Sequence, residues 1–300
     1  MQKEAPYISY IPQRITSAIT GYESLLRLHN DLSSAQKQEI QISFKNVVWL
    51  EANLCAILGA IIEELESRGN EVTLVDCERF HEKSDILSRN GFFKHYGVQI
   101  PTVREHKTPI SYKMFKEKEA VLYNQYIQAE LIDNPEFPRH SEGLGKKIKE
   151  NIYELFENAR THGKCKHIHT CGQFFPTKKK LHITIVDTGD TITENVQRFL
   201  KQNLSPSECI NWAMQLGNTT KEGDIPGGLG LGLIFEFINM NKGKIQIVSS
   251  NGYWELREGI VTKEDLSFSF SGTIANIEFD LSENKMYLLQ QEVIDMDSIF

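Results

Sequence analysis

The sequence contains few cysteines, and they show no regular spacing. There are five in 300 residues, an odd number without the arrangement of a disulfide framework. Disulfides persist in oxidising compartments, whereas cytosolic proteins keep their thiols reduced. We therefore expect reduced thiols and a cytoplasmic location.

Long apolar runs are also missing. No segment approaches the roughly 20 consecutive apolar residues that a membrane-spanning helix needs. The first six residues lack the apolar stretch of a secretion signal. We expect no membrane partner.

The chain has no excess of positive charge. Its 33 Lys and Arg residues against 40 Asp and Glu residues give a net charge of −7, which argues against general electrostatic binding of nucleic acid. With 40% hydrophobic and 24% charged residues, the composition allows a core of normal size, and the length suits two domains.

An α/β pattern begins near residue 39, after a mixed and poorly periodic segment. Ile40–Phe44 and Val72–Val75 are predicted strands, Leu54–Ser67 is a predicted helix, and Ile86–Phe93 is a predicted short helix that contains Gly91. This order resembles the STAS domain of bacterial anti-sigma antagonists over about residues 39–98. The resemblance implies an α/β fold for this part of the chain.

One turn differs from the phosphorylated members of that family. They carry a Ser or Thr in the turn before the long helix, whereas the matching turn here is Glu51–Leu54 and offers no hydroxyl group. We therefore expect this part of the chain to pack against the rest of the chain or against a protein partner, without being phosphorylated at that turn.

Residues 101–140 are predicted to connect the two parts. Within this segment, residues 115–132 have a helical pattern, and the two prolines of the 134–138 stretch end it.

A long predicted helix follows Ser141 and carries polar residues at a regular spacing. Glu154, Asn158 and His162 are four residues apart, which places them on one helix face. A carboxylate and an amide oxygen one turn apart can hold a water and a magnesium ion side by side, because Mg²⁺ prefers oxygen ligands and retains several waters. The alternative is a solvated polar face.

A predicted hairpin comes next, and its second strand ends at Asp187. A carboxylate at a strand end can accept a hydrogen bond from an exocyclic amine such as that of adenine, while Gly189 lets the base approach. In the first strand Cys165, His167, His169 and Cys171 alternate, but the outer two would lie about 20 Å apart at about 3.3 Å per residue. That distance is too long for a single zinc ion.

A loop with helical pieces, residues 191–226, separates this hairpin from a glycine run. The length of the loop suggests a lid. Glycines in the run let the backbone approach an anion, and a helix beginning there directs free N–H groups at it. The residues concerned are Gly228, Gly230, Leu231 and Gly232, and Lys221 precedes them.

The four segments in this order resemble the motifs of the GHKL ATPase superfamily, which includes sensor histidine kinases and anti-sigma kinases. Glu-x-x-x-Asn, Asp-x-Gly, Gly-x-Gly-x-Gly and Gly-Thr occur between residues 141 and 281. The resemblance implies a Bergerat α/β sandwich, with helices on one face of a mixed sheet, that binds ATP and Mg²⁺.

The resemblance also implies roles for individual residues. Asn158 would coordinate Mg²⁺, Glu154 would act on the attacking water or acceptor, and Asp187 with Gly189 would bind adenine. Thr273 would support Asp187, and the glycine run would wrap the phosphates. His162 and Lys221 are further candidates. The family's second glycine is replaced here, since Asp190 and Thr191 follow Gly189.

The sequence thus predicts an α/β protein of two domains, an N-terminal STAS-like one and a C-terminal Bergerat-fold one. The expected division is 1–38, 39–100, 101–140, 141–281 and 282–300, for the N-terminal segment, the STAS-like domain, the connection, the ATP-binding domain and the tail. The expected activity is slow ATP hydrolysis coupled to lid closure. Two alternatives remain, a serine/threonine kinase acting on a separate protein partner and an ATP sensor that does not hydrolyse the nucleotide.

Overall fold

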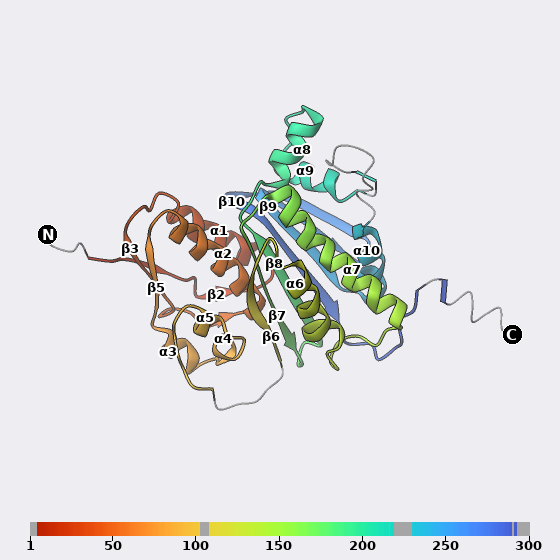
Figure 1. The fold of residues 1–300 in the computed structure, drawn as a ribbon, viewed down its shortest axis with the longest axis horizontal. Coiled ribbons are helices and arrows are strands. Elements are labelled where there is room, and N and C mark those ends of the chain that lie inside the picture. The colour runs from red at the N-terminus through yellow and green to blue at the C-terminus, as the bar shows by residue number, and fades with distance from the viewer. Residues whose placement is uncertain (1–4, 103–107, 216, 219–229, 290, 293–300) are drawn as a thin grey trace.

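The computed structural model describes residues 5–102, 108–215, 217–218, 230–289 and 291–292, with backbone only for 230–233. The described chain is mixed α/β, with two main sheets flanked by helices (Figure 1).

The N-terminal unit, residues 5–102, is built on a three-stranded parallel sheet in the order β1-β3-β5. Two helices of 13 residues, α1 and α2, lie between this sheet and the rest of the molecule (Figure 1). Its elements are β1 (Tyr7–Tyr10), β2 (Arg14–Ile15), α1 (Ile19–Asp31), β3 (Glu39–Ser43), β4 (Trp49–Leu50), α2 (Cys55–Ser67), β5 (Glu71–Val75), α3 (Cys77–His81), α4 (Ile86–Arg89) and α5 (Phe92–His95).

The predicted helix at 54–67 and strands at 40–44 and 72–75 are confirmed to within a residue or two. The predicted short helix is divided into α4 and α5 because Gly91 between them has a φ of 82°. The first 38 residues are more ordered than their pattern indicates, since β1 extends the sheet and α1 packs against β10.

The second sheet has five strands in the order β6-β7-β8-β10-β9, and every neighbouring pair is antiparallel. The mixed sheet implied by the family resemblance is therefore not observed. The strands of this five-stranded sheet and the helices in the same part of the chain are β6 (Pro109–Lys116), α6 (Ala120–Ile127), α7 (Glu142–Asn158), β7 (His167–Phe175), β8 (Lys180–Asp187), α8 (Ile192–Leu200), α9 (Pro206–Ala213), α10 (Gly230–Asn241), β9 (Lys244–Arg257) and β10 (Ile260–Asp280).

The segment expected to connect the two parts contributes an edge strand to this sheet. β6 ends at Lys116, so the helical prediction that began at Phe115 started too early, and α6 begins only at Ala120. The strand is held by pairing with β7, about 50 residues further along the chain, which the local sequence does not show.

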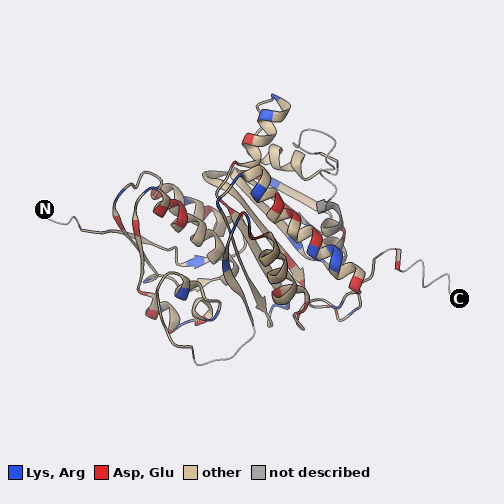
Figure 2. Ribbon diagram, viewed as in Figure 1, with Lys and Arg blue, Asp and Glu red and all other residues tan. Residues whose placement is uncertain are grey.

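Helices α6, α7 and α10 cover one face of the five-stranded sheet (Figure 1). The predicted helix after Ser141 is confirmed: the Ser141 hydroxyl accepts the Leu144 N–H, and Ile148, Ile152 and Phe156 are buried. Its outer side carries acidic and basic residues in alternation (Figure 2), including the Lys147–Glu150 and Glu157–Arg160 pairs. This is the amphipathic pattern of a helix that covers a sheet.

The N-terminal unit covers the opposite face of the same sheet. One hydrophobic cluster joins α1 and α2 to Cys171, Val186, Val248, Phe270 and Ile274 of the sheet. α2 approaches most closely at Gly59, where a Cβ would overlap the Tyr112 hydroxyl and lie 3.0 Å from His169 Nδ1. The two parts of the chain therefore share a core.

We predict that Gly59→Ala destabilises the protein. Alanine favours a helix by about 1 kcal/mol over glycine, but overpacking of a buried contact costs about 1–3 kcal/mol. Urea unfolding followed by tryptophan fluorescence reports on both parts, because Trp49 lies in β4 of the N-terminal unit and Trp254 in β9 of the five-stranded sheet.

Gly143→Ala is the matched control in a helix, because its Cβ would meet the ends of two side chains, Glu292 Oε1 at 2.7 Å and Leu289 Cδ1 at 3.3 Å, and no backbone atom. A Gly59→Ala protein as stable as Gly143→Ala would contradict the close packing of α2 on the sheet.

Candidate functional site

The candidate site begins with a buried carboxylate at the end of β8. The side chains of β8 alternate, so Ile183, Ile185 and Asp187 face the helical layer. Burial raises the pKa of Asp187 to about 7, although the backbone N–H groups of Gly189 and Thr273 oppose this rise. The Gly189 N–H donates to Asp187 Oδ1 at 2.9 Å. The carboxylate is thus held by backbone N–H donors, and burial is the dominant influence on its pKa.

Three glycines allow the backbone to close around Asp187. A Cβ on Gly189 would overlap the carbonyl oxygen of Gly163, which accepts the Asp190 N–H at 2.6 Å. A Cβ on Gly163 would lie 2.9 Å from Asp187 Oδ1. Gly272 has a φ of 121° and packs on the Asp187 backbone. Replacement of any of the three by a larger residue would displace the carboxylate.

Helix α7 leads directly to this turn. Glu154 and Asn158 are half-buried on α7, one turn apart as predicted. A π-helical turn, Ala159–Gly163, continues the helix and carries His162, so His162 is not in the α-helical geometry assumed for it. The turn ends at Gly163, against Asp187.

The N-terminus of α10 lies beside the same stretch of α7. Asn151 Oδ1 accepts the Ile234 N–H at 3.0 Å, one helical turn before Glu154. α7 ends near Asp187, whereas α10 ends where Asn241 donates to the Asp280 carbonyl at the other end of the sheet. The two helices are therefore antiparallel, and Glu154 and Asn158 lie toward the amino end of α10.

The glycine run can be followed only in part. Gly230, Leu231 and Gly232 form the first turn of α10, of which the structure describes the backbone alone. Lys221 and Gly228 lie outside the described residues, as do positions 216 and 219–226 of the expected lid, whereas its residues 191–215 are described. The helical pieces predicted before it are present as α8 and α9.

Thr273 lies opposite Asp187 in the β8–β10 register. Its hydroxyl is 3.0 Å from the Ser249 hydroxyl, which also accepts the Ile192 N–H at 2.9 Å. Thr273, Asp187 and the first turn of α8 are thus tied together.

A polar cleft of about 690 Å³ lies on the other side of the Gly163–Gly189 contact. It separates α1 of the N-terminal unit from the turn after β8, and its walls include His29, Ser33, Ser269 and Ser271. Glu154 and Asn158 are not among its lining residues, so this cleft is distinct from the region between α7 and α10.

The alternating Cys and His residues of the 165–171 stretch serve packing and hydrogen bonding. His169 Nε2 is 2.6 Å from Glu63 Oε2, and His167 contacts the other oxygen of the same carboxylate. Cys165 and Cys171 are buried free thiols. No cluster of three or more metal-ligating side chains occurs in the described residues.

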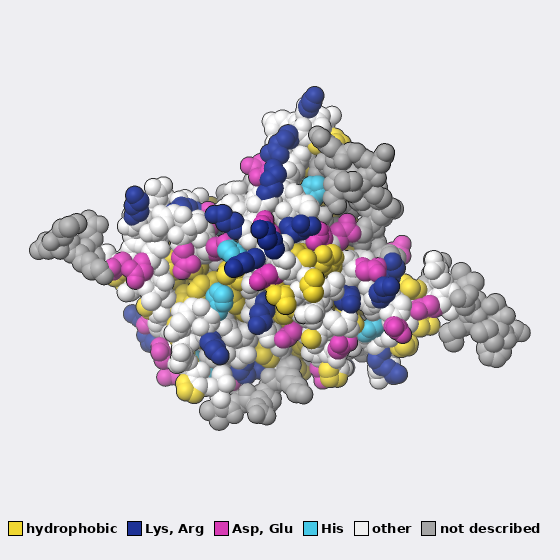
Figure 3. Space-filling model, in the orientation of Figure 1, with side chains coloured by type: hydrophobic (Ala, Val, Ile, Leu, Met, Phe, Trp, Pro, Cys, Tyr) yellow, Lys and Arg dark blue, Asp and Glu magenta, His cyan; other side chains and the backbone are white. Residues whose placement is uncertain are grey.

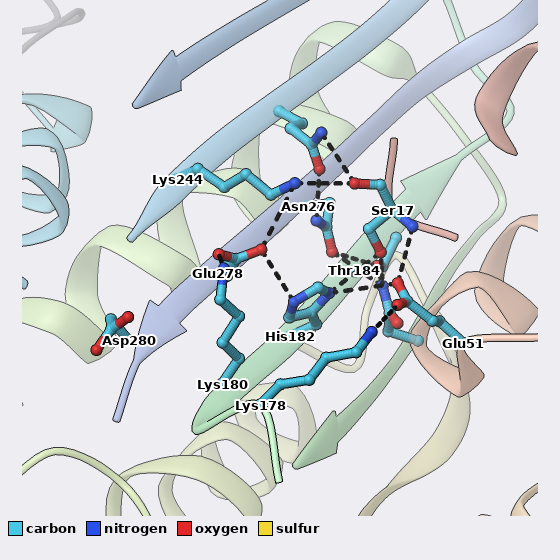
Figure 4. A network of polar contacts seen from close by, with 12 residues as sticks. Ser17, Glu51, Lys178, Lys180, His182, Thr184, Lys244, Asn276, Glu278 and Asp280 are labelled. Carbon is cyan, nitrogen blue, oxygen red and sulfur yellow. Dashed lines mark hydrogen bonds and ion pairs between the residues drawn. The ribbon is translucent and has the colours of Figure 1, made fainter. Parts of the chain in front are cut away.

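A second buried network joins the two parts of the chain (Figure 4). His182 lies between Ser17 Oγ, at 3.1 Å, and Glu278 Oε2, at 3.0 Å. This order matches the serine, histidine and carboxylate of nucleophilic enzymes. However, all three residues are at least nine-tenths buried, and none lines the cleft described above. The group therefore connects the two parts and is not a site for substrate.

Charged groups complete this network. Burial would raise the pKa of Glu51, but His182, the Ser17 N–H and Lys178 together lower it below its usual value. In the same way His182, Lys244 and Lys180 outweigh burial and lower the pKa of Glu278. Asn53 Nδ2 donates to Ser17 Oγ, Thr184 Oγ1 and Asn276 Oδ1 at 2.9–3.1 Å.

This network also holds the turn that the sequence pattern compared with the STAS phosphorylation site. Residues 51–54 are buried against β7 and β8, and the Ala52 N–H donates to Gln173 Oε1 at 2.8 Å. The turn packs against the rest of the chain, one of the two arrangements expected from the sequence.

No protein-family model matches the chain. No curated protein matches it either.

Within the described residues, no helix has the length and apolarity needed to span a bilayer. On the surface, acidic side chains are interspersed with Lys and Arg (Figure 3).

Several residues that shape the site were not identified from the sequence. Asn151, Gly163 and Ser249 contribute through close backbone approach or hydrogen bonds that depend on distant segments. The position of Asn151 seven residues before Asn158 and that of Gly163 directly after His162 were the available signals. Neither position indicates a role in the site by itself, because the contacts of both residues are made with distant parts of the fold.

We predict that the stability of Asp187→Asn relative to the unmodified protein rises with pH. The pKa of Asp187 increases on folding from 3.8 to about 7, so the folded state binds the proton more tightly. The carboxyl therefore stabilises the fold at low pH and loses this contribution as pH increases toward 7. Asparagine does not ionise, so the stability of Asp187→Asn relative to the unmodified protein should increase by roughly 1–3 kcal/mol as the pH rises.

Urea denaturation of both proteins at several pH values between 4 and 8 measures this difference. A difference that stays constant over this range would show that Asp187 is not a buried acid with a raised pKa.

Proposed function

We propose that this protein binds ATP with Mg²⁺ between α7, the amino end of α10 and the Asp187 turn, and that it hydrolyses the nucleotide. One observation supports the proposal: the turn after α7, the Asp187–Gly189 turn and Thr273 of β10, which are far apart in the chain, meet around Asp187. Gly163 at the end of α7, Gly189 and Thr273 all contact this carboxylate or its turn.

Asp187 supports recognition of an adenine. It is a buried acceptor flanked by glycines, at the end of a strand that faces the helical layer. An exocyclic amine would give the carboxylate a donor that water does not supply there, and hydrogen bonds to charged groups are worth about 1.5–3 kcal/mol. Guanine presents a carbonyl oxygen at the corresponding ring position, so an acceptor favours adenine.

The phosphates would lie at the amino end of α10. Unpaired N–H groups and the helix dipole favour negative charge there. The antiparallel pairing of α7 and α10, fixed by the Asn151–Ile234 hydrogen bond, directs that end toward Glu154 and Asn158. The chain thus provides donors for phosphate and oxygen ligands for a cation on neighbouring helices.

Asn158 would hold Mg²⁺ through its amide oxygen, a ligand type that suits this ion. When bound, Mg²⁺ would neutralise phosphate charge as the terminal bond breaks. Glu154 is half-buried, one turn from Asn158, and would accept a proton from the attacking water.

We predict that Glu154→Gln lowers the rate of ATP hydrolysis at least about 100-fold, the usual contribution of a general base. Mg-ATP affinity should change by less than about threefold, because glutamine keeps the size of the side chain. Phosphate release measures the rate, and calorimetry measures binding.

Glu150→Gln, at an exposed position one turn before Glu154 on the same helix, is the control and should match the unmodified protein in both measurements. Loss of binding with unchanged turnover in Glu154→Gln would exclude the role of a base.

We further predict that Asp187→Asn lowers ATP affinity about 10- to 100-fold, the equivalent of one hydrogen bond to a charged group. Asp190→Asn, three residues along the same turn and paired with Lys164, serves as the control and should retain affinity. Full affinity in Asp187→Asn would rule out the proposed adenine contact.

Incubation with γ-labelled ATP separates hydrolysis from the alternatives. Free labelled phosphate supports an ATPase, label on an added protein partner supports a kinase, and ATP that remains intact for hours supports a sensor. The absence of any ATP binding would refute all three.

A further inference from the structure

Strand β10 is interrupted by a bulge beside the candidate site. Its pairing with β9 shifts register between Phe270 and Thr273. Gly272 lies in the bulge with a φ of 121°, a conformation that glycine adopts readily. Bulges redirect side chains and often occur next to functional sites.

One side of the bulge is held by the N-terminal unit. The Ser271 hydroxyl donates to Glu64 Oε2 of α2 at 2.8 Å and lies 3.2 Å from His29 Nε2 of α1. His29 also contacts the bulge through Nδ1, which is 3.2 Å from the Ser269 carbonyl oxygen. Two helices of the N-terminal unit therefore converge on Ser269–Ser271.

Glu64 is itself fixed in place. His29 Nε2 lies 2.8 Å from Glu64 Oε2, and Arg68 pairs with Oε1. Burial would raise the pKa of Glu64, but the hydrogen bonds from His29 and Ser271 and the charge of Arg68 lower it to about 2. The carboxylate is therefore ionised at neutral pH and is a strong acceptor for Ser271.

The other side of the bulge holds Asp187. The Thr273 N–H hydrogen-bonds to Asp187 and lowers its pKa. Ser249 Oγ donates to the Gly272 carbonyl oxygen at 2.8 Å, and Gly272 packs on the Asp187 backbone. A shift of the bulge would move the donor and the backbone surface that orient this carboxylate.

We propose that Glu64 and Ser271 are positioning residues for Asp187, through which the N-terminal unit sets the adenine end of the nucleotide site. This inference builds on the proposed function. It gives the N-terminal unit a part in ATP binding that does not require it to be a phosphorylation substrate. Removal of the Ser271 hydroxyl frees the bulge from α2 while every residue at Asp187 stays in place.

The test is Mg-ATP calorimetry on the full chain carrying Ser271→Ala. We expect affinity to fall about tenfold, the effect of one hydrogen bond to a charged group. Ser271→Thr keeps the hydroxyl and suits a strand, so it should recover affinity to within about threefold of the unmodified protein.

Ser267→Ala is a matched control on the same strand. The Ser267 hydroxyl donates to Glu23 of the N-terminal unit at 3.0 Å and lies in the preceding register shift, between Asp265 and Phe270, outside the bulge at Phe270–Thr273. Its loss should leave affinity unchanged. Equal affinities in Ser271→Ala and Ser267→Ala, with the unmodified protein binding ATP, would overturn the proposal.

Glu64→Ala completes a double-mutant cycle. Because Glu64 acts on Asp187 through Ser271, the double variant should bind no more weakly than Glu64→Ala alone. Additive losses from the two substitutions would also contradict the proposal.

A second readout needs no nucleotide. Withdrawal of the Thr273 N–H should raise the pKa of Asp187, so in a Ser271→Ala background the stability gained by Asp187→Asn should keep increasing to a higher pH and reach a larger maximum. An unchanged pH profile would overturn the positioning role, and failure of the unmodified protein to bind ATP would refute only the proposed function.

Discussion

The central constraint on this structure is that the five-stranded sheet is buried on both faces. A sheet in contact with water on one side can carry unpaired polar residues there, but buried polar groups need partners because loss of hydration is costly. The face of this sheet toward the N-terminal unit carries His169, His182, Asn276 and Glu278, all buried. The N-terminal unit supplies partners for His169, His182 and Asn276, whereas Glu278 pairs with Lys180, His182 and Lys244 of the sheet itself.

The partners are distributed along the whole interface. Glu51 and Ser17 meet His182, Glu63 meets two histidines of β7, and Asn53 joins β8 to β10. These contacts surround an apolar cluster that continues from α2 into the sheet. Pairing of specific groups fixes the orientation of the two parts more closely than apolar contact alone, since apolar burial is non-directional.

The strand alternation links this interface to the candidate site. Along β8, His182 and Thr184 face the N-terminal unit, whereas Ile183, Ile185 and Asp187 face α7 and α10. A change at one face therefore reaches the other through the backbone of a single strand. At the bulge, Ser271 contacts the N-terminal unit, and the next two residues, Gly272 and Thr273, contact Asp187.

Local sequence determined several features by itself. The apolar spacing of α2 and α7, the Ser141 cap, the hairpin with its turn at 176–179 and the polar spacing of Glu154 and Asn158 depend on nearby residues, and each is present. The edge strand β6, the π-helical turn before Gly163 and the bulge in β10 could not be predicted, because each is stabilised by contacts with distant segments. Only the tertiary structure decided which charged groups are paired across the interface. A carboxylate such as Glu64 has the same local sequence whether it faces water or a histidine and a serine more than 200 residues away, and its hydrogen-bonding partner exists only after the chain has folded.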